Sequence, residues 1–266
     1  MRPTIWVTVV LLLAAAGCGP DFEQGMAAYE SGDFAGALAV WRPLAERGDL
    51  RAQFQMGVLC EKGEGTAVDD AAAADWYRRA ADSGLAAAQF NLAVLYFEGR
   101  GVERDDAQAA EWYTRAAEQG DSMAQYNLGG MYEAGHGVDR DPARALEWYR
   151  KAAEQGHARA QNNLGLLYDL GSGVEQDRAE AARWYRMAAE RGNVKARYNL
   201  GLLYKAGEGV EHDPIQAYVW LTLAAGAGDP NARGERDSMA ATMSEDDVRQ
   251  AQYQAMNWKP ATETGP

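Results

Sequence analysis

The sequence predicts an all-α protein, a right-handed α/α superhelix (solenoid) of stacked helical hairpins. The first observation is a fixed interval, because five tryptophans recur 36 residues apart and a sixth, Trp41, precedes them. The five are Trp76, Trp112, Trp148, Trp184 and Trp220. The second observation is that each is followed by an aromatic residue or leucine, then by Ala-Ala and a glycine, and the third is a Gly-x-Gly break with the same period. A period of this size is typical of a repeat array in which each unit packs on its neighbours.

Residues 1–17 are predicted to be a lipoprotein signal peptide. Arg2 supplies positive charge, and residues 5–16 form an apolar run of twelve, too short to span a bilayer at ~20 residues. Small residues then precede Cys18, and this pattern resembles the bacterial lipobox, in which the cysteine is lipidated and becomes the first mature residue. An ordinary cleaved leader with an incidental cysteine is the alternative.

Residues 18–21 would then be a short lipidated tether before a helix that begins near Phe22. Fully extended, it reaches roughly 10 Å, so the protein and its partner are expected close to the membrane. Gram-negative lipoproteins with Asp after the cysteine usually stay in the inner membrane. Gly19 holds that place, so the resemblance implies the outer membrane, facing the periplasm.

The next segment, 22–48, is predicted to be a degenerate N-terminal capping hairpin, with Gly25, Tyr29, Ala37 and Trp41 spaced as in a helical pair. Five 36-residue repeats then fill 49–228 without insertion.

The repeat starting at Leu85 shows how each unit forms two helices. Ala88, Leu92, Leu95 and Tyr96 recur at helical spacing and give the first helix, helix A, one apolar stripe. The Gly-x-Gly break follows, and its first glycine suits a left-handed C-cap. The second helix, helix B, is predicted to start at a recurrent aspartate that caps its first turn. These aspartates are Asp69, Asp105, Asp141, Asp177 and Asp213, and helix B of this unit is expected to bury Ala109, Trp112, Tyr113 and Ala116.

The recurring motifs are Leu-Gly-x-x-Tyr, Gly-x-Gly-Val-x-x-Asp and Trp-Tyr-x-x-Ala-Ala. Together they closely resemble the Sel1-like repeat, a relative of the tetratricopeptide repeat. Four positions depart from the pattern, namely Cys60, Thr66, Ala93 and Leu221. The resemblance implies a tetratricopeptide-like superhelix and an adaptor role in protein–protein interaction.

Residues 229–258 are predicted to be C-terminal capping helices, over 231–242 and 245–258, and 259–266 to be a disordered tail. Ser244 begins a capping box for the second of these helices. Its predicted apolar seam consists of Val248, Ala251, Ala255 and Trp258.

The net charge of −13 argues against a nucleic-acid partner, because there is no basic stripe to displace phosphate counterions. Only Cys60 remains after Cys18, so no intramolecular disulfide is expected. Cys60 stands in the place of a recurrent tyrosine, which predicts a small buried hydrophobic side chain; a reactive thiol is the alternative.

No catalytic residues, metal ligands or cofactor site are predicted, and the chain is not expected to be an enzyme. The three histidines, His136, His157 and His212, occupy different phases of different repeats, without ligand spacing. The Gly-x-Gly loops lack the preceding strand of a dinucleotide site.

A partner-binding surface is predicted on the face of helix A opposite its apolar stripe, the concave groove of such superhelices. Its candidate residues are Phe54, Val58, Phe90, Val94, Phe97, Tyr126, Leu166, Tyr198 and Leu202. The alternative is that these side chains only pack within the array. Asn91, Asn127, Asn163 and Asn199 are predicted to bridge backbone groups between helices.

These observations predict a membrane-anchored, periplasm-facing scaffold that holds a protein or peptide partner in the concave groove. One alternative is a protein that binds or hydrolyses cell-wall material or β-lactams, since cysteine-rich relatives have been linked to penicillin binding. Another is a purely structural brace in an envelope complex. The partner, the pathway and the oligomeric state are left open by the sequence.

Overall fold

The computed structural model describes residues 21–259, and this part of the chain consists of 14 α-helices without strands. The all-α prediction is confirmed. The predicted signal peptide, Cys18 and all of the predicted tail beyond Lys259 lie outside the described residues. The chain divides into two compact units, one up to Arg104 and one from Asp105 onward.

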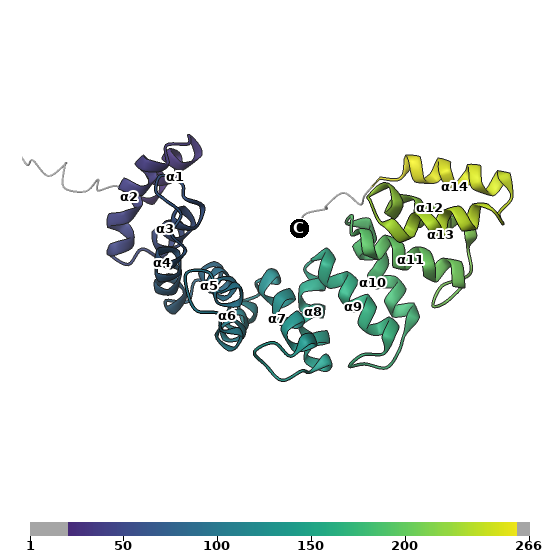
Figure 1. Ribbon diagram of the computed structural model, residues 1–266, viewed down its shortest axis with the longest axis horizontal. Coiled ribbons are helices and arrows are strands. Elements are labelled where there is room, and N and C mark those ends of the chain that lie inside the picture. The colour runs from purple at the N-terminus through teal and green to yellow at the C-terminus, as the bar shows by residue number, and fades with distance from the viewer. Residues whose placement is uncertain (1–20, 260–266) are drawn as a thin grey trace, which may run out of the picture. The chain divides into compact units, whose positions relative to one another are not determined.

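Unit 1 contains five helices that pack in chain order, each on the next (Figure 1). They are α1 (Phe22–Glu30), α2 (Phe34–Glu46), α3 (Leu50–Lys62), α4 (Asp70–Asp82) and α5 (Ala86–Glu98).

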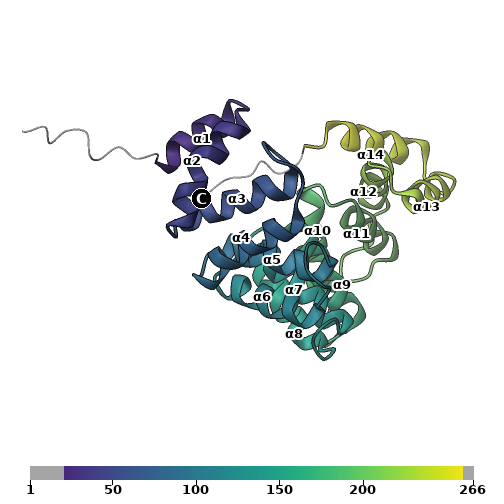
Figure 2. The same cartoon turned by 60° about the vertical axis from the view of Figure 1, so that its left-hand side comes forward.

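Unit 2 contains nine helices within the described residues. They are α6 (Asp106–Glu118), α7 (Ser122–Ala134), α8 (Pro142–Glu154), α9 (Ala158–Leu170), α10 (Arg178–Glu190), α11 (Val194–Ala206), α12 (Pro214–Gly226), α13 (Pro230–Ala240) and α14 (Glu245–Asn257). The helices from α6 to α13 pack consecutively, and α14 packs back on α12 (Figure 2).

The helix ends follow the predicted capping. Each recurrent aspartate accepts hydrogen bonds from amides in the first turn of its helix B, as Asp105 Oδ1 does from Ala107 N at 3.0 Å and Gln108 N at 2.9 Å. The first glycine of every Gly-x-Gly break is a left-handed C-cap, with φ from 68° to 77°. Both predictions are confirmed.

The second glycine of each break allows a close approach that the sequence did not reveal. At Gly101, φ is 67°, and an added Cβ would lie 2.1 Å from the carbonyl oxygen of Asp70. The loop therefore rests directly on the first turn of helix B in the preceding repeat. The same contact recurs at Gly65, Gly137, Gly173 and Gly209.

The recurrent tyrosines, rather than the tryptophans, are the deepest aromatic side chains of the repeats. Tyr77, Tyr149 and Tyr185 are buried, each against a helix A glycine, which follows Met56 in the first case and a leucine in the other two. Trp76 and Trp148 are only partly buried, and a cation lies over each ring, with Lys151 Nζ 3.9 Å from the Trp148 centroid.

Buried glutamines carry out the bridging that the sequence analysis assigned to asparagines. Gln125 Nε2 donates to the carbonyl oxygen of Ala117 at 3.0 Å, across the turn between α6 and α7. Gln53, Gln89 and Gln161 make the same bond to the last turn of the helix before them. The asparagine prediction is wrong for Asn91, Asn163 and Asn199, because the bonds of these three join side chains; for Asn127 it stays a prediction.

Both ends of the described region are closed by packed helices. In the N-terminal hairpin, Trp41 is fully buried against Gly25, and its Nε1 donates to the carbonyl oxygen of Phe22 at 3.1 Å. At the other end, Ala251 and Ala255 of α14 are buried against α12 and α13. Trp258 contacts Trp220 edge-on, with ring centroids 6.0 Å apart.

Candidate interaction surface

The five candidate residues of unit 1 lie on α3 and α5, and all are partly buried. Phe54 packs on Tyr77 of α4, with ring centroids 5.7 Å apart. Arg104 covers the Phe97 ring, its Cζ 5.5 Å from the centroid. These side chains therefore both contribute to packing and keep some accessible surface. Whether they bind a partner stays a prediction.

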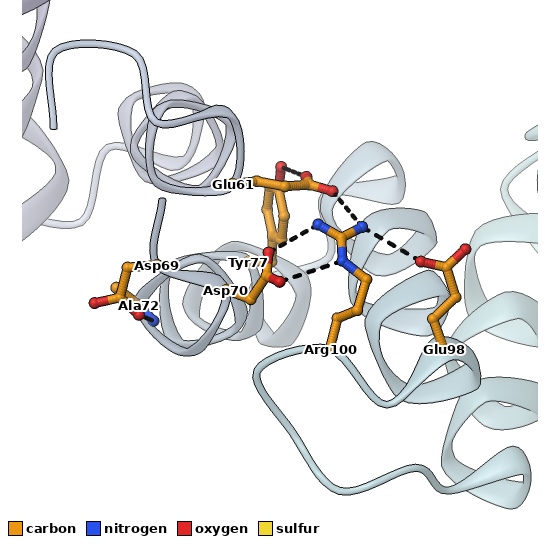
Figure 3. A network of polar contacts seen from close by, with 7 residues as sticks. All are labelled: Glu61, Asp69, Asp70, Ala72, Tyr77, Glu98 and Arg100. Carbon is orange, nitrogen blue, oxygen red and sulfur yellow. Dashed lines mark hydrogen bonds and ion pairs between the residues drawn. The ribbon is translucent and has the colours of Figure 1, made fainter. Parts of the chain in front are cut away.

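A polar network lies beside them and is centred on Arg100, the residue between the two glycines of the α5 break (Figure 3). Its guanidinium pairs with Asp70 at 2.8 Å, Glu61 at 3.0 Å and Glu98 at 3.3 Å. Tyr77 Oη donates to the other oxygen of Glu61 at 2.8 Å. One cation thus joins carboxylates of successive repeats, which indicates a stacking role.

In unit 2, the four candidate residues have different surroundings. Tyr126 of α7 stacks on His157, with ring centroids 4.8 Å apart, and faces a cavity. Leu202 lines a second cavity of about 430 Å³. Tyr198 packs against the buried cluster of α12–α14, and Leu166 is partly buried on α9. The structure thus does not gather these four side chains at one place.

The cavity at Tyr126 has a volume of about 520 Å³ and lies among the starts and inner faces of α7, α9 and α11. Its wall is predominantly amide and cationic. The polar lining residues are Tyr126, Arg159, Asn162, Asn163, Asn193 and Lys195.

A chain of hydrogen bonds orients the amides of this wall. Asn199 Nδ2 donates to Asn162 Oδ1 at 3.4 Å, and Asn162 Nδ2 donates to Asn163 Oδ1 at 3.3 Å. Asn163 in turn bonds to the hydroxyl of Tyr149, which donates to Glu133 Oε2 at 2.7 Å. Burial and this carboxylate raise the pKa of Tyr149, so the hydroxyl stays protonated.

The cavity also has a positive character. Arg159 and Lys195 are exposed, and neither forms an ion pair within residues 21–259. Burial, and then the charge of Arg159, lower the pKa of His157 below its usual 6.5. The neutral ring can therefore accept from Ala160 N at its Nδ1, at 3.1 Å, and cap α9.

Sequence reasoning missed Arg159, Asn162 and Lys195. A signal was present, because Asn162 interrupts the series of aromatic residues at its repeat position. The other members are Phe54, Phe90, Tyr126 and Tyr198.

The arrangement is suited to binding polar groups. Over residues 21–259, no group of three or more His, Cys, Asp or Glu side chains could hold a metal ion. Cys60 is buried, as predicted, and burial raises the pKa of its thiol, so it is a poor nucleophile. None of the described helices has the length and apolar character to cross a membrane.

A sequence model of the Sel1 repeat matches this chain five times, at 50–85, 86–121, 122–157, 158–193 and 194–229. The chain belongs to the Sel1 repeat family. The prediction from the recurring motifs is therefore confirmed. Sel1 repeats form a solenoid that commonly serves as a scaffold for protein–protein interaction and is generally non-catalytic.

Two solved Sel1-like structures resemble the chain closely. A Sel1 repeat protein from Oxalobacter formigenes is 31% identical, with a TM-score of 0.79 over 88% of this chain and 98% of that one. A protective antigen present in uropathogenic Escherichia coli strains, which displays an SLR fold, is 36% identical, with a TM-score of 0.82 over 87% of this chain. The match spans only 51% of that antigen. The curated proteins yielded no match.

Proposed function

We propose that this Sel1 repeat protein is a lipid-anchored scaffold at the bacterial outer membrane, facing the periplasm, which binds a protein or peptide partner on its helix A faces. The observation that carries the binding role is the cavity at Tyr126. It combines a half-buried aromatic ring with hydrogen-bonded amides and with two cations that form no ion pair among the described residues. Binding sites commonly combine an aromatic anchor with a few oriented polar groups.

The anchoring part of the proposal is supported by the sequence around Cys18. An apolar run of twelve residues precedes small residues and this cysteine. Helix α1 begins at Phe22, capped by Asp21. A tether of residues 18–21 spans roughly 10 Å when extended, which would hold the first hairpin near the membrane and favour a membrane-proximal partner.

The anchor can be tested with radiolabelled palmitate in Gram-negative cells that produce the full chain. We expect the label in the wild-type protein and in the outer-membrane fraction. Cys18→Ser should lose the label and release the protein into the soluble periplasmic fraction. Equal labelling of wild type and Cys18→Ser would show that the anchor is assigned to the wrong residue.

The binding surface can be tested by placing a photo-crosslinking amino acid at Met123 of α7 in the same cells. Met123 is 49% exposed and lies three residues before Tyr126. The matched control is Met256 of α14, which is 85% exposed. We expect a crosslinked membrane-fraction protein from position 123 only. If both positions give the same products, the helix A faces are not the partner site and a bracing role is favoured. If position 123 gives only soluble products, the partner is not membrane-proximal.

A further inference from the structure

The cavity at Tyr126 exists because one repeat position has changed. Phe54, Phe90, Tyr126 and Tyr198 place a ring at the sixth residue of their repeats, and Asn162 is the exception. An asparagine side chain is much shorter than a tyrosine, so space remains between α7, α9 and α11. Asn162 is only 6% exposed, so its amide lies in the depth of the wall.

Charge is the second feature of this wall. The third residue is Arg159 in one repeat and Lys195 in the next, where the two preceding repeats have Ala87 and Met123, and the first has Arg51, which pairs with Glu23. Both cations line the cavity, neither is in an ion pair within the described chain, and none of the described lining residues is acidic. In a protein with a net charge of −13, this is a local reversal of sign.

The helix starts beside the cavity add to this positive potential. Helices α9 and α11 are capped by the neutral side chains of His157 and Asn193, whereas α7 is capped by Asp121. The N-terminal end of a helix carries a partial positive charge, which a neutral cap leaves in place. Arg159 and Lys195 stand in these first turns.

The amides of the wall keep unused hydrogen-bonding capacity toward the cavity. Asn162 Oδ1 already accepts from Asn199, and Asn163 Oδ1 accepts from Asn162. Each amide nitrogen has two N–H groups, and the recorded bond of Asn162 Nδ2 uses one of them. Each amide oxygen likewise has a second lone pair, so the two cations of the wall, rather than the amides, make acceptor oxygens the favoured groups of a ligand.

From these observations we propose that the cavity binds a carboxylate of an acidic peptide segment. The carboxylate lies between Arg159 and Lys195, and Asn162 donates a hydrogen bond to the same segment. Tyr126 and Val194, also in the lining, contact the aliphatic parts of the flanking residues. This inference rests on the proposed scaffold function and adds the chemistry of the partner. The carboxylate can belong to an Asp or Glu side chain or to a C-terminus.

Fluorescence anisotropy of three labelled octapeptides, with the full chain in detergent, tests the proposal. One alternates Glu and Ala and is amidated at its C-terminus. The second has Gln in place of Glu and is also amidated, and the third is the Gln peptide with a free C-terminal carboxylate. We expect the first or third to bind, according to the source of the carboxylate, and the second to bind at least tenfold more weakly. Equal binding of all three overturns the proposal.

Three variants locate the site. Arg159→Ala combined with Lys195→Ala should weaken acidic-peptide binding roughly tenfold, since exposed ion pairs each contribute a factor of a few. Asn162→Tyr restores the aromatic series and should abolish binding by filling the cavity. The control is Arg51→Ala, at the same repeat position in unit 1, where Arg51 already pairs with Glu23 at 3.3 Å; binding should not change.

Circular dichroism separates misfolding from loss of the site, and the double alanine variant still decides the question if Asn162→Tyr does not fold. Unchanged binding in that double variant overturns the proposal. If these tests fail while position 123 still crosslinks a membrane protein, the scaffold function stands and only the acidic-peptide assignment falls.

Discussion

The contact made by the second glycine of each break can be tested at Gly101. An alanine there would need φ near 67° and would place its Cβ 2.1 Å from the carbonyl oxygen and 2.2 Å from the carbonyl carbon of Asp70. Real Cβ atoms essentially never lie closer than 3.0 Å. The obstacle is backbone at the start of α4, so no side-chain rotation relieves it, and the loop must move away.

The expected destabilisation has three parts. The left-handed conformation costs alanine about 1–2 kcal/mol, of which a more restricted unfolded chain returns somewhat less than 1 kcal/mol. The steric overlap adds about 1–3 kcal/mol. Displacement of Arg100 from Asp70 and Glu61 adds about 1 kcal/mol, since these pairs are partly solvated. The total for Gly101→Ala is therefore about 2–5 kcal/mol.

Gly84 provides the matched control. Its φ is 94°, and an added Cβ would meet nothing within 4 Å. Gly84→Ala should therefore cost only the conformational part, about 1 kcal/mol. Urea unfolding followed by circular dichroism gives both values, and hydrogen exchange should show lost protection at the start of α4 for Gly101→Ala alone. Equal losses in the two variants would refute the close-approach argument.

Two further predictions concern hydrogen bonds in unit 2. Gln125→Leu should destabilise the protein by about 1–2 kcal/mol, which is more than Gln161→Leu. The reason is that Gln125 also accepts a hydrogen bond from Gln155 at 2.8 Å, whereas Gln161 Oε1 has no partner among the described residues. Urea unfolding of both variants checks this order. His157→Asn should keep the α9 cap and remove a pH dependence. Folding lowers the pKa of His157, so the stabilising contribution of the neutral ring is complete above pH 6.5 and is lost as the pH falls through the folded-state pKa. The difference between the unfolding free energies of the wild type and His157→Asn should therefore change in that pH window only.

The sequence predicted the hairpins and their ends because the determinants are local. A capping aspartate needs only the amides two and three residues after it, and a left-handed glycine needs only its own backbone. Such features repeat at 36-residue intervals together with the local structure that they specify. This is why the caps at Asp177 and Gly171 could be placed before the structure was known.

Contacts between repeats could not be placed in the same way. Arg100 binds Asp70 and Glu61, which lie thirty or more residues earlier, and nothing in the local pattern assigns that pairing. The buried glutamines were accessible in principle, because Gln53, Gln89, Gln125 and Gln161 recur with the full period. A polar residue that keeps the period indicates a satisfied internal bond, since an unpaired buried amide is costly.

The candidate site differs from the stacking contacts, because its distinctive residue does not recur with the period. Residues that keep the period serve the stacking that every repeat must achieve, as Tyr149 and Tyr185 do against their glycines. A partner, by contrast, must distinguish one repeat from the next, so its contacts have to come from positions where the period is broken. The predicted series of aromatic residues was periodic and therefore weak evidence for a specific site. Asn162 breaks the series of aromatic residues. It lines one cavity with Arg159 and Lys195, which form no ion pair among the described residues, whereas Arg51 at the same repeat position pairs with Glu23.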